Sequence, residues 1–466
     1  MPSPKLTDRI KSIQSIRLAG SSSTWDIRIG YPDASKHGSI TSITPPSSED
    51  ISNPPLALPS LTHPHIHLDK AFVHSAPEYA HLLPSTGSFQ EALSFTMKAK
   101  QQFTREDLLR RGEWLLAESV SAGVTAMRAF VEVDSTVKFT CLEAGLALKE
   151  QWKDACEIQI ACFAQDPIFS GEFGEENRSL VEKALCNYPR IDVIGTTPYV
   201  ESSVEAAKRN IEWAIGRALQ LGKHVDFHLD YNLDPEKEAL VWHVLKTLCE
   251  SGWTTNSTSK RVMLGHCTRL TLFKDDEWDR LAREICDHDL PVSFVGLPTS
   301  DLYMASSPSA SSGQCSHHRP RGTLQVPEMI RRYGLDAVLG VNNVGNAFTP
   351  WGSPDPLFLA CLGVGIYQSG TQADAELLYE CVSTRARKAI GLPSASGLIL
   401  RPGDVPDLIL FYDRDETGCE VSRPRYRVAD VIWDPPARLN RDVVSGGRLK
   451  PAALAGWSLD TRYQFA

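Results

Sequence analysis

The sequence predicts an α/β fold: a (β/α)8 TIM barrel with a small β-sandwich made from both termini. Three observations lead to this prediction. Short β-branched runs alternate with helical segments through the middle of the chain, a pattern typical of βα units around a parallel sheet. The runs number eight, as a TIM barrel requires. The two flanks carry further strand-like pieces, and neither flank alone has enough strand for an independent core.

The predicted barrel strands are short β-branched and apolar runs, the first of which begins at Leu56. In chain order they are Leu56–Leu61 leading into His63, Val124–Val133, Ile158–Ala164, Ile191–Tyr199, His224–Leu229, Arg261–His266, Pro291–Gly296 and Asp336–Val341. The clearest helix between them is Glu106–Ser121, whose apolar residues recur near helical spacing. It is followed by Gly123, a C-terminal glycine cap.

The flanks are expected to pair with each other. Trp25–Ile29 and Ile40–Ile43 read as strands before the barrel, and Leu408–Tyr412 and Val428–Trp433 read as strands after it. We therefore expect residues 1–57 and 395–466 to form one composite β-sandwich domain and residues 58–394 to form the (β/α)8 barrel. A Ser-rich loop, residues 305–318, follows the seventh strand and is expected to overhang the barrel mouth.

Composition favours a small molecule as the partner. The chain carries 48 Lys and Arg against 57 Asp and Glu, a formal charge of −9, and no long basic run, which disfavours nucleic acid and anionic membranes. No apolar stretch reaches the roughly 18 residues of a membrane span, and the first residues are unlike a signal peptide. The eleven cysteines form no C-x-x-C pair. We expect a cytoplasmic protein with reduced cysteines; whether it forms a homo-oligomer stays open.

Histidines follow several of the predicted strands. His65 and His67 stand two apart in an extended segment, so both imidazoles point to one face and can reach one metal ion. His228 and His266 close the fifth and sixth strands. Because the C-terminal ends of barrel strands converge on one rim, these four side chains are candidates for a common site.

These motifs resemble the cytosine-deaminase-like branch of the amidohydrolase superfamily, across essentially the whole chain. The run His65-Ile66-His67-Leu68-Asp69 looks like the first metal motif of that family, and His228 is similar to its strand-5 ligand. The resemblance implies one divalent ion, zinc or else iron or manganese, held by His65, His67 and His228. It further implies that His266 polarises the attacking water or the substrate.

The resemblance also implies a set of substrate contacts. Gln165 stands where the family places a glutamine that reads the amide-like edge of a pyrimidine. Phe348 and Trp351 match its aromatic, substrate-stacking tail, and Asn343 matches a second strand-8 residue that contacts substrate. Lys70 directly follows the metal motif and is a candidate to hold an anionic or carbonyl group, or else to pair with a neighbouring acid.

Two residues depart from the family pattern where protons are moved. The family carries Asp on strand 8 and Glu three residues after the strand-5 histidine; here these positions are Asn342 and Tyr231. An amide is no general base near neutral pH, and tyrosine is a poor substitute for a carboxylate. His266, Asp230, Lys70 or Tyr231 would then move the protons.

Three interpretations follow from these departures. The first is a hydrolase or deaminase that acts on a non-peptide C–N bond of a small flat N-heterocycle or cyclic amide through a metal-activated water. The second is a different metal-assisted reaction, such as opening of a cyclic amide ring. The third is a catalytically altered or inactive family member that binds a small molecule.

Overall fold

The computed structural model describes residues 6–31, 38–47, 53–305, 321–450 and 463–465, so most of the expected loop 305–318 lies outside the described residues. Its larger part is an eight-stranded parallel sheet in which each strand pairs with the next along the chain. The strands are β5 (Leu61–His67), β6 (Val124–Glu132), β7 (Glu157–Ala164), β8 (Val193–Thr196), β9 (His224–Leu229), β10 (Val262–His266), β11 (Val292–Gly296) and β12 (Ala337–Leu339).

The sheet closes on itself just beyond β12. The Asn342 N–H donates to the carbonyl of His65 at 3.1 Å, and the His67 N–H donates to the carbonyl of Asn342 at 2.8 Å. A parallel bridge between Ile66 and Asn342 joins the last strand to the first. The predicted (β/α)8 barrel is therefore confirmed, and the residue that closes it is also a candidate site residue.

The first barrel strand begins later than the sequence indicated. Leu56–Pro59 is β4, which belongs to the second sheet and pairs antiparallel with β13 (Leu408–Phe411). Only after Ser60 does the chain enter β5 and the barrel. The apolar run from Leu56 to Leu61 is buried throughout, so hydrophobicity alone gives no sign of the change of sheet. The H-x-H pair consequently lies within the barrel strand and not after it.

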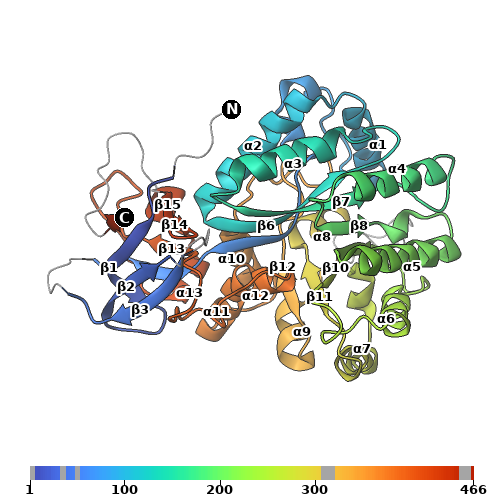
Figure 1. Ribbon diagram of the computed structural model, residues 1–466. Coiled ribbons are helices and arrows are strands. Elements are labelled where there is room, and N and C mark those ends of the chain that lie inside the picture. Colours follow the sequence, from blue (N-terminus) through green and yellow to red (C-terminus); the bar gives the residue numbers. More distant parts are fainter. Residues whose placement is uncertain (1–5, 32–37, 48–52, 306–320, 451–462, 466) are drawn as a thin grey trace.

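Helices cover the outside of the barrel (Figure 1). They are α1 (Phe89–Lys100), α2 (Arg105–Ala122), α3 (Thr140–Trp152), α4 (Gly174–Asn187), α5 (Val204–Leu221), α6 (Val241–Glu250), α7 (Asp275–Asp287), α8 (Pro298–Met304), α9 (Val326–Tyr333), α10 (Pro356–Ile366), α11 (Gln372–Cys381) and α12 (Thr384–Ala389). The predicted helix Glu106–Ser121 is α2. It starts at Thr104, whose side chain accepts from the Asp107 N–H, and ends at Gly123 with φ 113°.

The second sheet combines strands from both ends of the chain. Its order is β15-β14-β13-β4-β1-β2-β3, with β16 paired to β1. In Figure 1 its blue and red strands lie side by side, away from the barrel. The strands not yet given are β1 (Ile10–Leu18), β2 (Thr24–Gly30), β3 (Ser39–Thr44), β14 (Arg441–Ser445), β15 (Arg448–Lys450) and β16 (Tyr463–Phe465). The terminal sheet is confirmed; the boundaries at 57/58 and 394/395 stay a prediction.

One predicted strand of this flank is a helix. Val428–Trp433 forms α13, which contacts α10 and α11 and belongs to the barrel core. Val428, Ala429, Val431 and Ile432 are buried while Trp433 is exposed, which is a one-sided helical pattern. The β-branched composition of this short run favoured a strand, and packing against two helices decided otherwise.

A buried arginine joins the terminal sheet to the barrel. The Arg441 guanidinium donates to the Ala122 carbonyl at 2.9 Å and to the Pro436 carbonyl, and it pairs with Asp355 at 2.8 Å.

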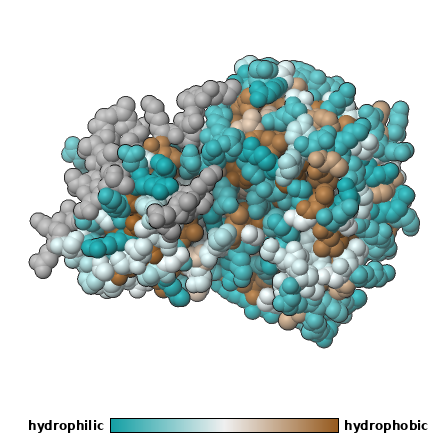
Figure 2. Space-filling view, viewed as in Figure 1, coloured by the Kyte–Doolittle hydropathy of each residue, from teal (hydrophilic) through white to brown (hydrophobic). Residues whose placement is uncertain are grey.

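The face of the molecule in Figure 2 is mostly hydrophilic, with apolar patches between. Within the described residues, no helix has both the length and the apolar character to cross a membrane.

Candidate metal centre

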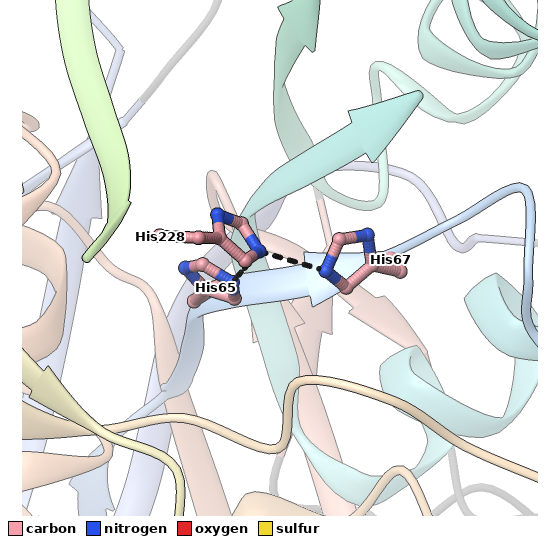
Figure 3. Close-up of side chains that lie close together, drawn as sticks. All are labelled: His65, His67 and His228. Atoms are coloured by element: carbon pink, nitrogen blue, oxygen red, sulfur yellow. Dashed lines mark hydrogen bonds between the residues drawn. The ribbon is translucent and has the colours of Figure 1, made fainter. Parts of the chain in front are cut away.

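Three buried histidines meet at the C-terminal end of the barrel (Figure 3). The Nε2 of His228 lies 3.1 Å from the Nε2 of His65 and 3.0 Å from the Nε2 of His67. His65 and His67 come from β5 and His228 from β9, so the period of two along β5 brings both rings to the same side. The structure thus brings together the three residues that the sequence analysis named as ligands.

Two phenylalanine rings pack against this cluster. The Phe130 ring lies 4.2 Å from the His65 ring, and the Phe163 ring lies 4.4 Å from the His228 ring, between centroids. Burial, helped by the nearby Lys70 ammonium, lowers the pKa of His67 well below its ordinary value. Burial and the neighbouring histidines do the same to the pKa of His228. Both imidazoles are therefore neutral, the form that binds metal ions.

The cluster fits a divalent cation better than a set of hydrogen bonds. The Nε2 of His228 faces two other ring nitrogens, and a neutral ring nitrogen is either a donor or an acceptor, so protons alone satisfy the trio poorly. A cation can accept all three lone pairs. The Nδ1 of His65 also lies 3.5 Å from Asp226 Oδ1, an arrangement typical of the carboxylates that orient metal-bound histidines.

Asn342 adds an oxygen to this arrangement. Its Oδ1 is buried and has no hydrogen-bond partner in the structure, while its Nδ2 donates to Ser300 Oγ at 2.9 Å. Ser300 Oγ lies 2.6 Å from Thr349 Oγ1, and the Thr349 hydroxyl donates to the Phe348 carbonyl. The proton between the two hydroxyls must therefore come from Ser300, which leaves Ser300 Oγ as an acceptor for the Asn342 amide. This relay fixes which end of the amide is free.

Backbone strain gathers at the same strand ends. His266 has φ 65° and Asn342 has φ 67°, both in the left-handed region that few non-glycine residues adopt. Asp230, after β9, has φ 49°. Such conformations persist where surrounding contacts enforce them, and they occur often at functional sites.

A small cavity opens beside the histidines, and most of the predicted site residues line it. They are His67, His228, His266, Tyr231, Asn342, Gln165, Lys70, Asn343 and Phe348. Lys70 and Gln165 touch, because the Lys70 ammonium donates to Gln165 Oε1 at 2.9 Å. The Tyr231 ring lies 4.0 Å from the His266 ring, and burial raises the pKa of Tyr231 well above its ordinary value. Tyr231 therefore offers a neutral hydroxyl, which is a donor and not a base.

Asp230 and Trp351 are not brought into this cavity. The Asp230 carboxylate turns away and accepts from the Leu240 and Val241 N–H groups at 2.9 and 3.1 Å, at the start of α6. Trp351 lies outside, 36% exposed, with its ring 5.5 Å from that of Phe358. Both placements have one cause: position after a strand identifies the rim, but the local turn decides where the side chain points.

The structure adds residues that the sequence analysis missed. Phe89, Tyr199 and Ser300 also line the cavity. Asp301, in α8, accepts from His266 Nδ1 at 2.8 Å, and its other oxygen accepts from Thr323 Oγ1 and the Leu297 N–H. The position of Ser300 and Asp301 after the seventh strand was an available signal. No sequence signal pointed to Phe89, because it lies in the long segment between β5 and β6 and does not directly follow a strand.

Comparison with known proteins agrees with this architecture. No protein-family model matches the chain. Over 392 residues it is 23% identical to the N-isopropylammelide isopropyl amidohydrolase of Pseudomonas sp. (strain ADP), an alignment that covers 81% of this chain and 87% of that protein. The predicted relationship to the amidohydrolase superfamily is confirmed.

Solved amidohydrolase-type structures share the fold over nearly the whole chain. The 5-methylcytosine deaminase of Klebsiella pneumoniae matches with a TM-score of 0.76 and 19% identity, covering 96% of this chain and 99% of that one. The atrazine chlorohydrolase of Arthrobacter aurescens, solved with zinc, matches with a TM-score of 0.63 and 14% identity, covering 96% and 97%. These likenesses show the shared fold, and the candidate divalent-metal site rests on the histidine cluster of this chain itself.

Proposed function

We propose that this chain is a metal-dependent hydrolase that breaks a non-peptide C–N bond of a small flat N-heterocycle or cyclic amide. One observation carries the proposal: the three convergent imidazoles of His65, His67 and His228 adjoin a cavity that is also lined by His266, whose Nδ1 is held by Asp301. A ligand site beside an oriented acid–base group is the minimum that metal-assisted hydrolysis needs.

His65, His67 and His228 would hold the ion, with Asn342 Oδ1 facing the same point. Zinc is our choice among divalent ions, because three histidines leave an open position typical of catalytic zinc sites. A divalent ion held there supplies Lewis acidity and lowers the pKa of the water bound to it. Because all four protein groups are neutral, none of them cancels the charge that provides this effect.

His266 is the residue we assign to proton transfer. A carboxylate only accepts hydrogen bonds, so Asp301 Oδ1 places the proton of His266 on Nδ1 and leaves Nε2 as a base. Tyr231 packs on the His266 ring and donates from its hydroxyl to the Ser300 carbonyl at 3.4 Å. Asn342 orients water through its free Oδ1. In this proposal His266 takes over proton transfer from the carboxylates that the family carries. Tyr231 and Asn342 are neutral and only position His266 and the water.

Substrate shape follows from the aromatic walls. Phe89, Phe348, Tyr199 and Tyr231 surround the cavity, which suits a flat ring. Gln165 and Asn343 provide amide groups for its edge. The names of the relatives specify 5-methylcytosine and N-isopropylammelide, both flat nitrogen heterocycles, and this supports the same class here. The relatives whose names state a reaction are hydrolases or deaminases, which does not favour a non-catalytic binding role.

The proposed setting is the cytoplasm. The cysteines that the structure describes are all unpaired, and five of them are buried, as expected for reduced residues in a core. The proposed partner is a small molecule, and the number of subunits is a matter for a solution measurement of mass.

Elemental analysis and a turnover screen test the proposal together. We expect about one divalent ion per chain in the purified protein, and loss of that ion in a His65→Ala, His67→Ala double variant. The metal-loaded chain should release ammonia or amine from aminated pyrimidines or pterins, or open the ring of a cyclic amide, and the double variant should do neither. A chain that binds no metal on titration, or a metal-loaded chain silent on the whole panel, contradicts the proposal.

A further inference from the structure

Three of the residues that line the cavity offer donors and a cation. They are Lys70, Gln165 and Asn343, and no Asp or Glu stands among the described residues that line the cavity. Carboxylates occur nearby but lie behind the residues that line it. The identity of the atoms that remain free on these three side chains therefore decides what kind of ring edge the site can recognise.

The amide of Asn343 has only one orientation open to it. Asn346 Oδ1 accepts from the Phe348 and Thr349 N–H groups at 3.0 and 3.1 Å, so the Asn346 amino group must point the other way. That amino group donates to Asn343 Oδ1 at 2.8 Å. The oxygen of Asn343 is therefore occupied, and its amino group is the part left for a ligand.

Gln165 is fixed by the same logic. The Lys70 ammonium can only donate, so the atom it meets at 2.9 Å must be the carboxamide oxygen of Gln165. The carboxamide nitrogen of Gln165 carries two protons, so a donor remains for a ligand even beside the contact of this side chain with the Tyr199 hydroxyl. Two amino groups and an ammonium thus border the cavity, and the oxygens of both amides are already satisfied.

A buried carboxylate pairs with Lys70. Glu132 Oε1 pairs with Lys70 at 2.6 Å, and Glu132 Oε2 pairs with Lys100 at 2.6 Å. Of these two lysines, which are both buried, only Lys70 lines the cavity. The Lys70 ammonium also lies 5.5 Å from the centre of the Phe348 ring, the aromatic wall of the same cavity.

The side chains of the histidine cluster and Asn342 contribute no anion either. His65, His67, His228 and Asn342 are imidazoles and an amide, and neither kind of side chain carries a negative charge. Two carboxylates lie behind these groups and are already engaged: Asp226 pairs with the buried Arg128 at 3.0 Å, and Asp301 accepts from His266 Nδ1 at 2.8 Å. A divalent ion at this centre would therefore bring charge that its immediate protein groups do not balance, and uncompensated buried charge is costly.

We infer that this site binds its substrate as an anion, an N-heterocycle whose O–C–N–C–O imide edge has lost its proton and lies against Lys70, Gln165 and Asn343. The inference rests on the proposed function and narrows its substrate class. An imide anion presents three acceptors in a row, which matches the donors of these three side chains. The negative charge of such a substrate would balance the positive charge of the metal ion. The neutral Asn342, which stands where the family has a carboxylate, does not provide that balance.

A matched pair of ring analogues tests the inference by binding alone. Uracil and 6-azauracil differ by one ring atom, but 6-azauracil loses its imide proton near neutral pH and uracil only in alkaline solution. We expect calorimetric titration of the full chain, reconstituted with zinc, to give a Kd at pH 8 about tenfold or more lower for 6-azauracil. The preference should disappear at pH 5.5, where both ligands are neutral.

Two variants and one control locate the effect. Lys70→Met should bring the two Kd values at pH 8 within about threefold of each other. Gln165→Glu keeps an oxygen for Lys70 and places a second one where the amino group was, so it should also abolish the preference if the first variant does not fold. Lys100→Met removes the other ammonium on Glu132, which lies outside the cavity, and should keep the preference.

The outcomes separate this inference from the proposed function. Equal affinity for uracil and 6-azauracil, a preference kept in folded Lys70→Met and Gln165→Glu variants, or no saturable binding of 6-azauracil each overturns the inference. Ammonia release from neutral amino-heterocycles with no preference for anions leaves the proposed function standing and rejects the inference. Anion-selective binding by a chain that hydrolyses none of the compounds supports the inference and contradicts the proposed function.

Discussion

Ser300 accepts a hydrogen bond from Asn342 Nδ2 at 2.9 Å, and this contact determines that the amide oxygen of Asn342 faces the histidine cluster. An asparagine at this position could otherwise present either an oxygen or an amino group. An amino group there would repel a cation. The hydroxyl relay from Ser300 to Thr349 thus makes a neutral side chain usable where the family carries a carboxylate.

Changing Asn342 to Asp tests this role. The new carboxylate adds a negative charge beside the ion, so we expect metal affinity to rise by about tenfold or more and the pKa of bound water to rise with it. Activity at neutral pH should fall as a result. Competition with a chelator measures the first effect, and the pH profile of kcat measures the second.

Asn343→Asp is the matched control for that change. It places the same charge on the neighbouring residue, whose oxygen already faces Asn346 and not the histidines. Its effect on metal affinity should be clearly smaller. Equal gains in the two variants would show that the orientation of Asn342 has no special role.

The partnership of His266 with Asp301 gives a second prediction. In Asp301→Asn the amide can donate to Nδ1, which favours the tautomer with the proton on Nε2 and removes the base from the cavity. We expect kcat to fall by about 10²–10⁴-fold, as for loss of a general base, with metal content unchanged. Wild-type kcat in a folded, metal-loaded Asp301→Asn variant would remove His266 from the mechanism.

His224, at the start of β9 and far from the site, predicts a pH dependence of stability. Burial, together with the Arg128 and Lys260 cations, lowers the pKa of His224 to about 2. The unfolded chain therefore binds a proton below about pH 6.5 that the folded chain refuses. Stability should be unaffected by this group above that pH and should fall as the pH drops below it, by about 1.4 kcal/mol per pH unit.

His224→Asn isolates this contribution. The asparagine keeps an acceptor for the Arg261 N–H, which donates to His224 Nδ1 at 2.9 Å, but it does not titrate. The free energy of unfolding, measured by urea denaturation between pH 6.5 and 4.5, should fall less steeply in the variant. Parallel curves for the two proteins would mean that His224 is protonated in the folded state.

Truncation after residue 395 tests the composite domain. The deletion removes β13, β14 and β15, so β4 loses its antiparallel partner and the buried Arg441 contacts vanish. Unpaired strand edges promote aggregation. We expect the shortened chain to be insoluble or to lack a cooperative unfolding transition. A soluble fragment 1–395 with a sharp thermal transition would place the domain boundary elsewhere.

Local patterns determined much of the architecture and part of the site. Alternating β-branched and helical runs predicted the barrel, and the pleat of an extended strand predicted that His65 and His67 share a face. Gly123 predicted the end of α2. These predictions succeeded because each depends on the geometry of a few consecutive residues.

Only tertiary structure decided which residues complete the site and how they are oriented. Asp301 meets His266 across 35 positions of sequence, and Ser300 meets Asn342 across 42. The same packing turned Asp230 toward α6, made Val428–Trp433 a helix and moved the start of the first barrel strand from Leu56 to Leu61. A hydrogen bond forms between groups that are close in space, and the number of residues between two positions does not determine that distance.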